Sequence, residues 1–203
     1  EGALGNLAGG LAGGGITTAN AGVPFSRGTK DGELGSLEHT RAIIRALKDD
    51  IHDLRVDHLI HARFDMTCTA AVEALDGLLG GGAVDLVSVM DHTPGQGQYR
   101  NVETLVANRM KSGLSEEDAR AHVERRIKDA VPAEQILKNL ERISRLCKSH
   151  CVAMASHDDD TVEKSHLMAD IGTVISEFPV TYEAAEIAKD RGLMIAMGAP
   201  NAM

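Results

Sequence analysis

The feature that most constrains the fold is a short apolar segment, residues 152–160, that ends abruptly in charged side chains. Its odd-numbered and even-numbered positions are both apolar, which predicts a strand buried on both faces, as in a parallel sheet. Residues 161–172 follow with helical spacing, and we expect Asp160 to cap that helix with Glu163. His157 should therefore end a buried strand, where parallel α/β folds bind ligands. The alternative is that residues 158–160 only cap the helix and His157 is a hydrogen-bonded residue at the sheet edge.

Strand-like and helix-like segments alternate along the chain. We expect strands near residues 15–23, 56–67, 83–92, 152–157, 173–179 and 192–201. Between them lie helical patterns near residues 4–14, 37–53, 70–79, 132–149, 161–172 and 184–188. This alternation predicts a parallel sheet with right-handed crossovers. About six strands suit either an open doubly wound sheet or part of an eight-stranded (β/α)8 TIM barrel.

Residues 98–131 hold more helical material than one crossover needs, including a capping box at Ser115 and Asp118. We therefore expect a lid-like helical insertion within a single domain of residues 1–203. The chain starts at Glu1 without a methionine and stops at Met203, directly after a strand-like run. Both ends are therefore expected to be cut from a longer protein.

Composition narrows the class of protein. A net charge of −9 and the lack of tryptophan argue against a sequence-independent nucleic-acid binder, which needs basic surface and stacking rings. Apolar runs stay below the roughly 18 residues of a membrane span, and no signal pattern opens the chain, so we expect a cytoplasmic protein without a membrane partner. A homo-oligomer is compatible with the sequence.

The cysteines are three in number and widely split, so they predict no disulfide framework. Cys147 and Cys151, with His150 between them, could be imagined as zinc ligands. We expect instead that Cys147 faces inward on a helix and that Cys151 begins the next strand, both as small buried groups.

Metal-competent side chains stand at four expected strand ends, namely Asp65, His92, His157 and Glu177. Zinc and manganese accept imidazole nitrogen and carboxylate oxygen together. Such an ion would lower the pKa of a bound water to about 7 and so supply a nucleophile. Arg63 shares a strand face with His61 and Asp65 and could hold an anionic substrate. The alternative for Asp65 is an ion pair with Arg63 or His61.

Four motifs resemble, in order and spacing, the phosphonate-pathway branch of the amidohydrolase superfamily. They are Asp91-His-Thr-Pro-Gly-Gln, Ala155-Ser-His-Asp-Asp-Asp, Ile175-Ser-Glu-Phe-Pro and Met197-Gly-Ala-Pro-Asn. The resemblance spans nearly the whole chain and implies a distorted TIM barrel with a metal site at its top. It also implies hydrolysis of the triphosphate of a ribose 1-methylphosphonate, with release of pyrophosphate.

The resemblance implies a role for each matching residue. His92 and His157 would be the metal ligands on the fifth and sixth barrel strands, holding one or two zinc or manganese ions. Asp65 stands where the family has Glu on the fourth strand. It would therefore be a third metal ligand, although its side chain is shorter, and Asp65 and Arg63 would be catalytic residues. Arg63, Glu177 and Asn201 would contact the phosphorylated sugar substrate.

The sequence also departs from the family. The His-x-His pair of the first strand and the aspartate of the last strand are absent. The resemblance therefore implies that the chain is the middle portion of the enzyme, an incomplete barrel with its first and last strands missing. Two alternatives stay open: a cyclic-amide or deacetylase-type amidohydrolase, and a non-catalytic scaffold that retains the fold.

Overall fold

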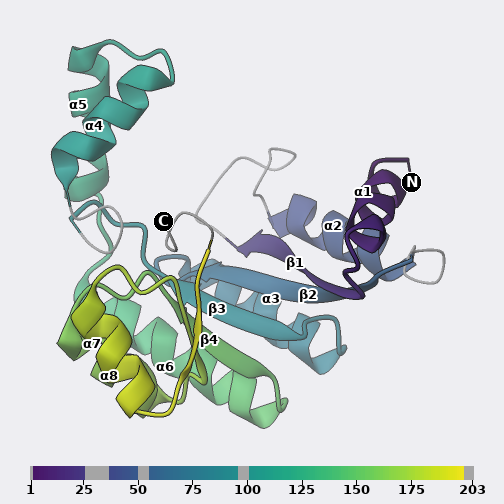
Figure 1. Ribbon diagram of the computed structural model, residues 1–203. Helices are drawn as coiled ribbons and strands as arrows, with labels where there is room; N and C mark the ends of the chain where they lie inside the picture. Colours follow the sequence, from purple (N-terminus) through teal and green to yellow (C-terminus); the bar gives the residue numbers. More distant parts are fainter. Residues whose placement is uncertain (1, 26–36, 50–54, 96–100, 199–203) are drawn as a thin grey trace. The chain divides into compact units, whose positions relative to one another are not determined.

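In the computed structural model the described residues are 2–25, 37–49, 55–95 and 101–198 (Figure 1). The strands are β1 (Thr18–Phe25), β2 (Asp57–Asp65), β3 (Leu86–Met90), β4 (Ala153–His157), β5 (Ile175–Glu177) and β6 (Met194–Ala196). The helices are α1 (Gly2–Gly13), α2 (Leu37–Asp49), α3 (Thr69–Gly80), α4 (Val102–Lys111), α5 (Glu116–Lys128), α6 (Ala133–Ser149), α7 (Val162–Ile171) and α8 (Tyr182–Asp190). Each segment expected from the sequence is present with bounds that differ by a few residues, although the parts expected at residues 50–53 and 199–201 lie outside the described residues. None of these helices is long and apolar enough to cross a membrane.

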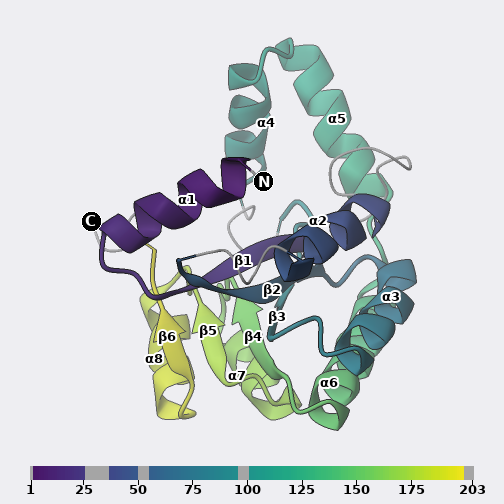
Figure 2. The same ribbon diagram turned by 90° about the vertical axis from the view of Figure 1, so that its right-hand side faces the viewer.

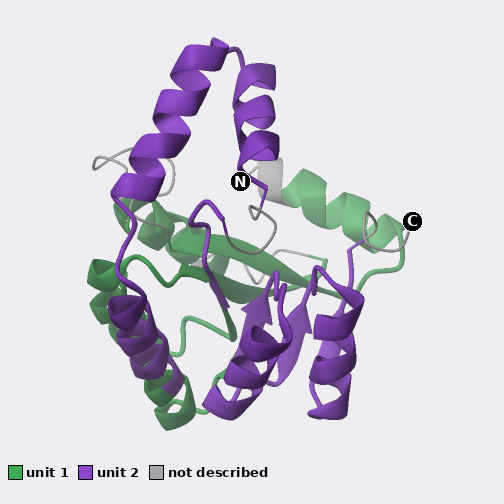
Figure 3. Cartoon of the chain, turned by 90° about the vertical axis from the view of Figure 1, so that its left-hand side faces the viewer, with its two compact units in different colours: residues 1–88, 145–153 green, residues 89–144, 154–203 purple. Residues whose placement is uncertain are grey.

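The described strands belong to one parallel sheet in which each strand is hydrogen-bonded to the next in chain order, β1-β2-β3-β4-β5-β6. This confirms the α/β class with a parallel sheet. Residue contacts divide the chain into two compact units (Figure 3). The first comprises residues 1–88 and 145–153, and the second comprises residues 89–144 and 154–203.

The first unit is built on the pair β1 and β2. Their register runs from Thr18 opposite Asp57 to Phe25 opposite Phe64. The rings of Phe25 and Phe64 are fully buried and stack with centroids 5.7 Å apart. Helix α3 adds an apolar face to the same unit, with Val72 and Leu75 fully buried. Burial of such side chains stabilises the fold by about 1.5–3 kcal/mol each.

The second unit contains β5 and β6, which pair in parallel, with α7 and α8 alongside them (Figure 2). Thr161 caps α7, because its side chain accepts a hydrogen bond from the amide of Lys164 at 3.1 Å. The expectation that Asp160 is this cap is therefore wrong. Thr161 has the extended backbone that a cap requires, which leaves Asp160 in the preceding turn. Gly172 ends α7 with φ 100°, a left-handed conformation that favours glycine.

Helices α4 and α5 form a helical hairpin within residues 98–131, where the sequence predicts an insertion (Figure 1). Asn101 caps α4, and the predicted cap Ser115 accepts a hydrogen bond from the amide of Asp118 at 3.1 Å. The hairpin has a small apolar cluster of its own, made of Leu105, Val106, Ala119 and Val123 with Val102 packed against it. We call residues 101–129 the α4–α5 hairpin below.

The cysteines differ in exposure. Cys147 is buried on α6, as expected, and burial raises the pKa of its thiol to about 11. The expectation that Cys151 is buried is wrong: it precedes β4 in a turn, with φ 55° and an exposed side chain. The turn that joins α6 to β4 places it at the surface.

We expect Cys151 to react with iodoacetamide at pH 8, and Cys147 to stay unmodified until the protein is denatured. The thiolate is the nucleophile, and a buried thiol with a raised pKa supplies almost none. Peptide mass spectrometry after timed labelling measures both sites, with Cys151→Ser as the control. Equal labelling rates at the two cysteines would contradict this assignment.

Candidate functional site

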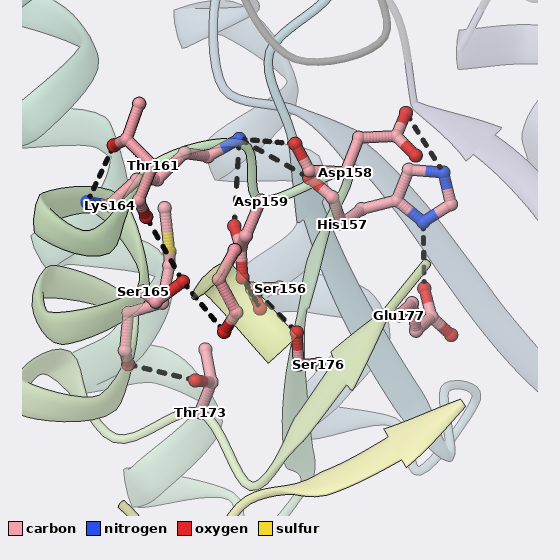
Figure 4. A network of polar contacts seen from close by, with 12 residues as sticks. Ser156, His157, Asp158, Asp159, Thr161, Lys164, Ser165, Thr173, Ser176 and Glu177 are labelled. Atoms are coloured by element: carbon pink, nitrogen blue, oxygen red, sulfur yellow. Dashed lines mark hydrogen bonds and ion pairs between the residues drawn. The ribbon is translucent and has the colours of Figure 1, made fainter. Parts of the chain in front are cut away.

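His157 and Glu177 meet where two neighbouring strands end (Figure 4). They are register partners, the last residues of β4 and β5, and both are buried. Nδ1 of His157 lies 3.0 Å from Oε2 of Glu177. Because a carboxylate oxygen only accepts, Nδ1 is the donor in this contact, and in the neutral imidazole the lone pair is then on Nε2. The ring of Phe178 packs edge-on against the imidazole, with centroids 5.2 Å apart.

Asp158 brings a second carboxylate to the same imidazole. Its Oδ2 lies 3.6 Å from Nε2 of His157, which is too long for a hydrogen bond. Asp158 has φ 52°, and its amide donates to the carbonyl of Glu177 at 3.0 Å. A left-handed conformation costs a non-glycine residue about 1–2 kcal/mol, and such strain concentrates at functional sites. Nε2 and this carboxylate thus present two donor groups side by side.

Asp159 and Lys164 fix the segment that follows His157. Asp159 is 1% exposed, and its carboxylate accepts hydrogen bonds from the hydroxyls of Ser156 and Ser176. The ammonium of Lys164 lies 3.5 Å from Oδ1 of Asp159 and also donates to the carbonyl of Asp158 at 3.1 Å. Three segments, β4, β5 and α7, therefore share one polar network (Figure 4).

This network was missed in the sequence. The only signal was the run of three carboxylates, residues 158–160, for which the sequence predicted a role in capping the next helix. Nothing in the local pattern shows that the second of the three, Asp159, is the buried one. Its lysine partner is five residues away in the chain, on the first turn of α7.

His92 was expected as the last residue of a strand over residues 83–92, but β3 ends at Met90, two residues before it. Because β3 and β4 are hydrogen-bonded neighbours, His92 and His157 stand at the ends of adjacent strands. The carbonyl of His92 accepts a hydrogen bond from Nη2 of Arg126 at 2.6 Å. The preceding Asp91 accepts from the amide of Thr93 at 2.9 Å, which shapes the turn.

Asp65 and Arg63 belong to the first unit, at the end of β2. Oδ1 of Asp65 accepts hydrogen bonds from the amide and the hydroxyl of Thr67, at 2.9 Å and 2.6 Å. The side chain of Arg63 lies over β1, since a Cβ added at Gly22 would meet its Cδ at 3.2 Å. Asn201 lies outside the described residues.

The structure thus brings together His157, Asp158 and Glu177, of which Asp158 was not among the predicted site residues. Glu177 was expected at the substrate, but its carboxylate contacts the imidazole of His157. Across the described part of the chain, no group of three or more His, Cys, Asp or Glu side chains is close enough to hold a metal ion. The imidazole and carboxylate of His157 and Asp158 fit the chemistry of zinc or manganese, as part of a ligand set.

Comparison with known proteins gives one informative match. No family model matches the chain. The chain is 36% identical over 151 residues to the alpha-D-ribose 1-methylphosphonate 5-triphosphate diphosphatase of Escherichia coli strain K12. The match covers 72% of this chain and 39% of that protein, so the chain spans about two fifths of its relative's length.

Proposed function

Because the chain is homologous to the alpha-D-ribose 1-methylphosphonate 5-triphosphate diphosphatase family, we propose that the protein containing it is a metal-dependent diphosphatase of phosphonate metabolism. Its reaction would release pyrophosphate from the triphosphate of ribose 1-methylphosphonate 5-triphosphate. The observation that carries the proposal is the pairing of His157 with Glu177 at the ends of β4 and β5, beside Asp158. This pairing lies inside two of the motifs that resemble the family.

The strand order supports a barrel as the finer description of the fold. In a (β/α)8 barrel each strand neighbours the next in the chain, as the described strands do. A doubly wound sheet reverses its order part-way, as in 3-2-1-4-5-6. In a barrel the carboxyl ends of the strands form the face where chemistry occurs, and His92 and His157 stand at such ends.

His92 and His157 would hold the divalent ion, zinc or manganese, with the carboxylate of Asp158 next to the second imidazole. A bound ion of this kind supplies a water whose pKa is lowered to about 7, which serves as the nucleophile at neutral pH. Glu177 keeps the proton on Nδ1 of His157 and so keeps a lone pair on Nε2. Asp65 as a third ligand, and Arg63 and Asn201 as substrate contacts, stay predictions.

The test of this function is pyrophosphate release by the purified full-length protein. The substrates are ribose 5-triphosphate analogues with and without a 1-phosphonate group, set against dihydroorotate as a cyclic amide. We expect pyrophosphate from the triphosphates and no ring opening. Hydrolysis of the cyclic amide alone would overturn the proposal in favour of an amidase. If the protein hydrolysed neither substrate and bound no stoichiometric metal, the result would indicate a scaffold that retains the fold.

Glu177→Gln should weaken binding of the divalent ion about tenfold, the lower end of the usual range for an outer partner of a ligating histidine. The amide oxygen still accepts the Nδ1 proton, but it lacks the negative charge that makes the imidazole more basic. Competition with a chromogenic chelator measures the affinity. Glu183→Gln, at an exposed position on the first turn of α8, is the matched control. Equal metal affinity in the two variants would refute the role of Glu177.

A further inference from the structure

The α4–α5 hairpin contains three arginines that no carboxylate of the described residues pairs with. Among the described residues, the guanidinium groups of Arg109, Arg125 and Arg126 form no ion pair, although the chain has a net charge of −9. The same hairpin does neutralise Arg120, which lies 2.9 Å from Glu103 and 3.1 Å from Glu116. Among the arginines of the hairpin, Arg120 is therefore paired with carboxylates and these three are not paired with any described carboxylate.

The positive charges of the three arginines affect one histidine, His122. His122 lies one turn before Arg125 and Arg126, on the same face of α5, and Arg109 approaches from α4. The pKa of His122 lies below its usual value, first because of burial and then because of these three positive charges. Its Nε2 is buried and has no hydrogen-bond partner among the described residues. The buried imidazole nitrogen and the three guanidinium groups therefore lie in one region in which, among the described residues, no carboxylate forms an ion pair with these arginines.

One of these arginines also reaches the candidate active site. Nη2 of Arg126 donates a hydrogen bond to the carbonyl of His92, at the end of β3. The cluster therefore lies next to the turn that carries a proposed metal ligand. Among the described residues, the other two guanidinium groups form no hydrogen bond to this turn, and Arg125 donates to the carbonyl of Ala121 on its own helix, at 3.2 Å.

We propose that Arg109, His122, Arg125 and Arg126 form a binding site for the oligophosphate chain of the substrate. The proposal rests on the proposed function, because it names the residues that select a triphosphate. Guanidinium groups bind phosphate oxygens through paired N–H donors, and three of them match the charge of an oligophosphate. Arg126 would position the bound chain by linking the hairpin to the turn at His92.

Inorganic tripolyphosphate is the probe, and isothermal titration calorimetry of the full-length protein measures its affinity. The double variant Arg109→Gln/Arg125→Gln should weaken binding about a hundredfold, roughly tenfold for each guanidinium group that no longer donates to a phosphate oxygen. In turnover assays it should raise KM by a similar factor and leave kcat within about twofold, because these groups hold the substrate before and during reaction. Arg120→Gln, which removes an arginine that is already paired, is the matched control and should change neither value.

His122 provides a readout that does not need activity. Added tripolyphosphate should shift its ring signals in NMR spectra and raise its pKa, since a bound anion favours the imidazolium form. The double variant and the control variant are first compared by circular dichroism to establish that they are folded.

The outcomes separate this inference from the proposed function. Normal diphosphatase turnover with an unchanged KM in the double variant would overturn the inference and leave the function intact. Tripolyphosphate binding that depends on Arg109 and Arg125, in a protein without diphosphatase activity, would support the inference and overturn the function. Equal losses of affinity in Arg120→Gln and the double variant would also overturn the inference. Such losses would come from the overall positive charge of the hairpin and not from contacts of Arg109 and Arg125 with the phosphate oxygens.

Discussion

Replacing His157 by alanine in the full-length protein is expected to abolish pyrophosphate release and stoichiometric divalent metal together. The imidazole is 4% exposed, and Glu177 and Phe178 hold it in one orientation. Its loss removes the Nε2 donor and leaves the buried carboxylate of Glu177 without this partner. We expect turnover to fall by at least about a thousandfold, more than the 10–100-fold usual for an outer partner.

The measurements are metal analysis of the purified protein and a coupled pyrophosphate assay. His166→Ala is the control, because this histidine is partly exposed on α7, where its Nδ1 lies 3.0 Å from Nη1 of Arg191. It should keep both metal and activity. Full metal content with retained turnover in His157→Ala would remove this residue from the active site.

Asp159→Ala should lower the free energy of unfolding by about 3–5 kcal/mol, the usual cost of removing one partner of a buried ion pair. Asp159 is 1% exposed, and Lys164 beside it is also largely buried, at 16%. The variant leaves the ammonium of Lys164 without its carboxylate and the hydroxyls of Ser156 and Ser176 without their acceptor. Urea unfolding followed by circular dichroism measures the change.

A double-mutant cycle with Lys164→Met shows whether the cost comes from this pair. The combined variant should be less destabilised than the sum of the two single ones, because no charge is then left buried. Asp170→Ala is the matched control, since this carboxylate pairs with Arg191 on the surface and should change stability little. Additive effects of Asp159→Ala and Lys164→Met would show that the two side chains do not interact.

Local pattern in the sequence was sufficient for the order and type of the elements. The apolar run before His157 predicted β4, and the helical spacing of the residues after it predicted α7. Both predictions were possible because burial on both faces of a strand and the period of a helix determine which neighbouring positions are apolar. The same logic predicted His92 and His157 at strand ends, and His157 is the last residue of β4 whereas His92 lies two residues after β3. The cap of α7 was missed by one residue, since Asp160 and Thr161 are both good caps and backbone conformation decides between them.

The partners of these side chains depended on tertiary structure. Glu177 contacts His157 because the register of β4 and β5 sets these residues opposite each other, and a register cannot be derived from either strand alone. Asp159, rather than its two neighbours in the carboxylate run, is the buried one, and its partners come from β4, β5 and α7. Arg126 reaches the carbonyl of His92 across 34 positions in the chain. Sequence periodicity reports which face of an element is buried, whereas a contact between distant residues depends on how the elements are packed.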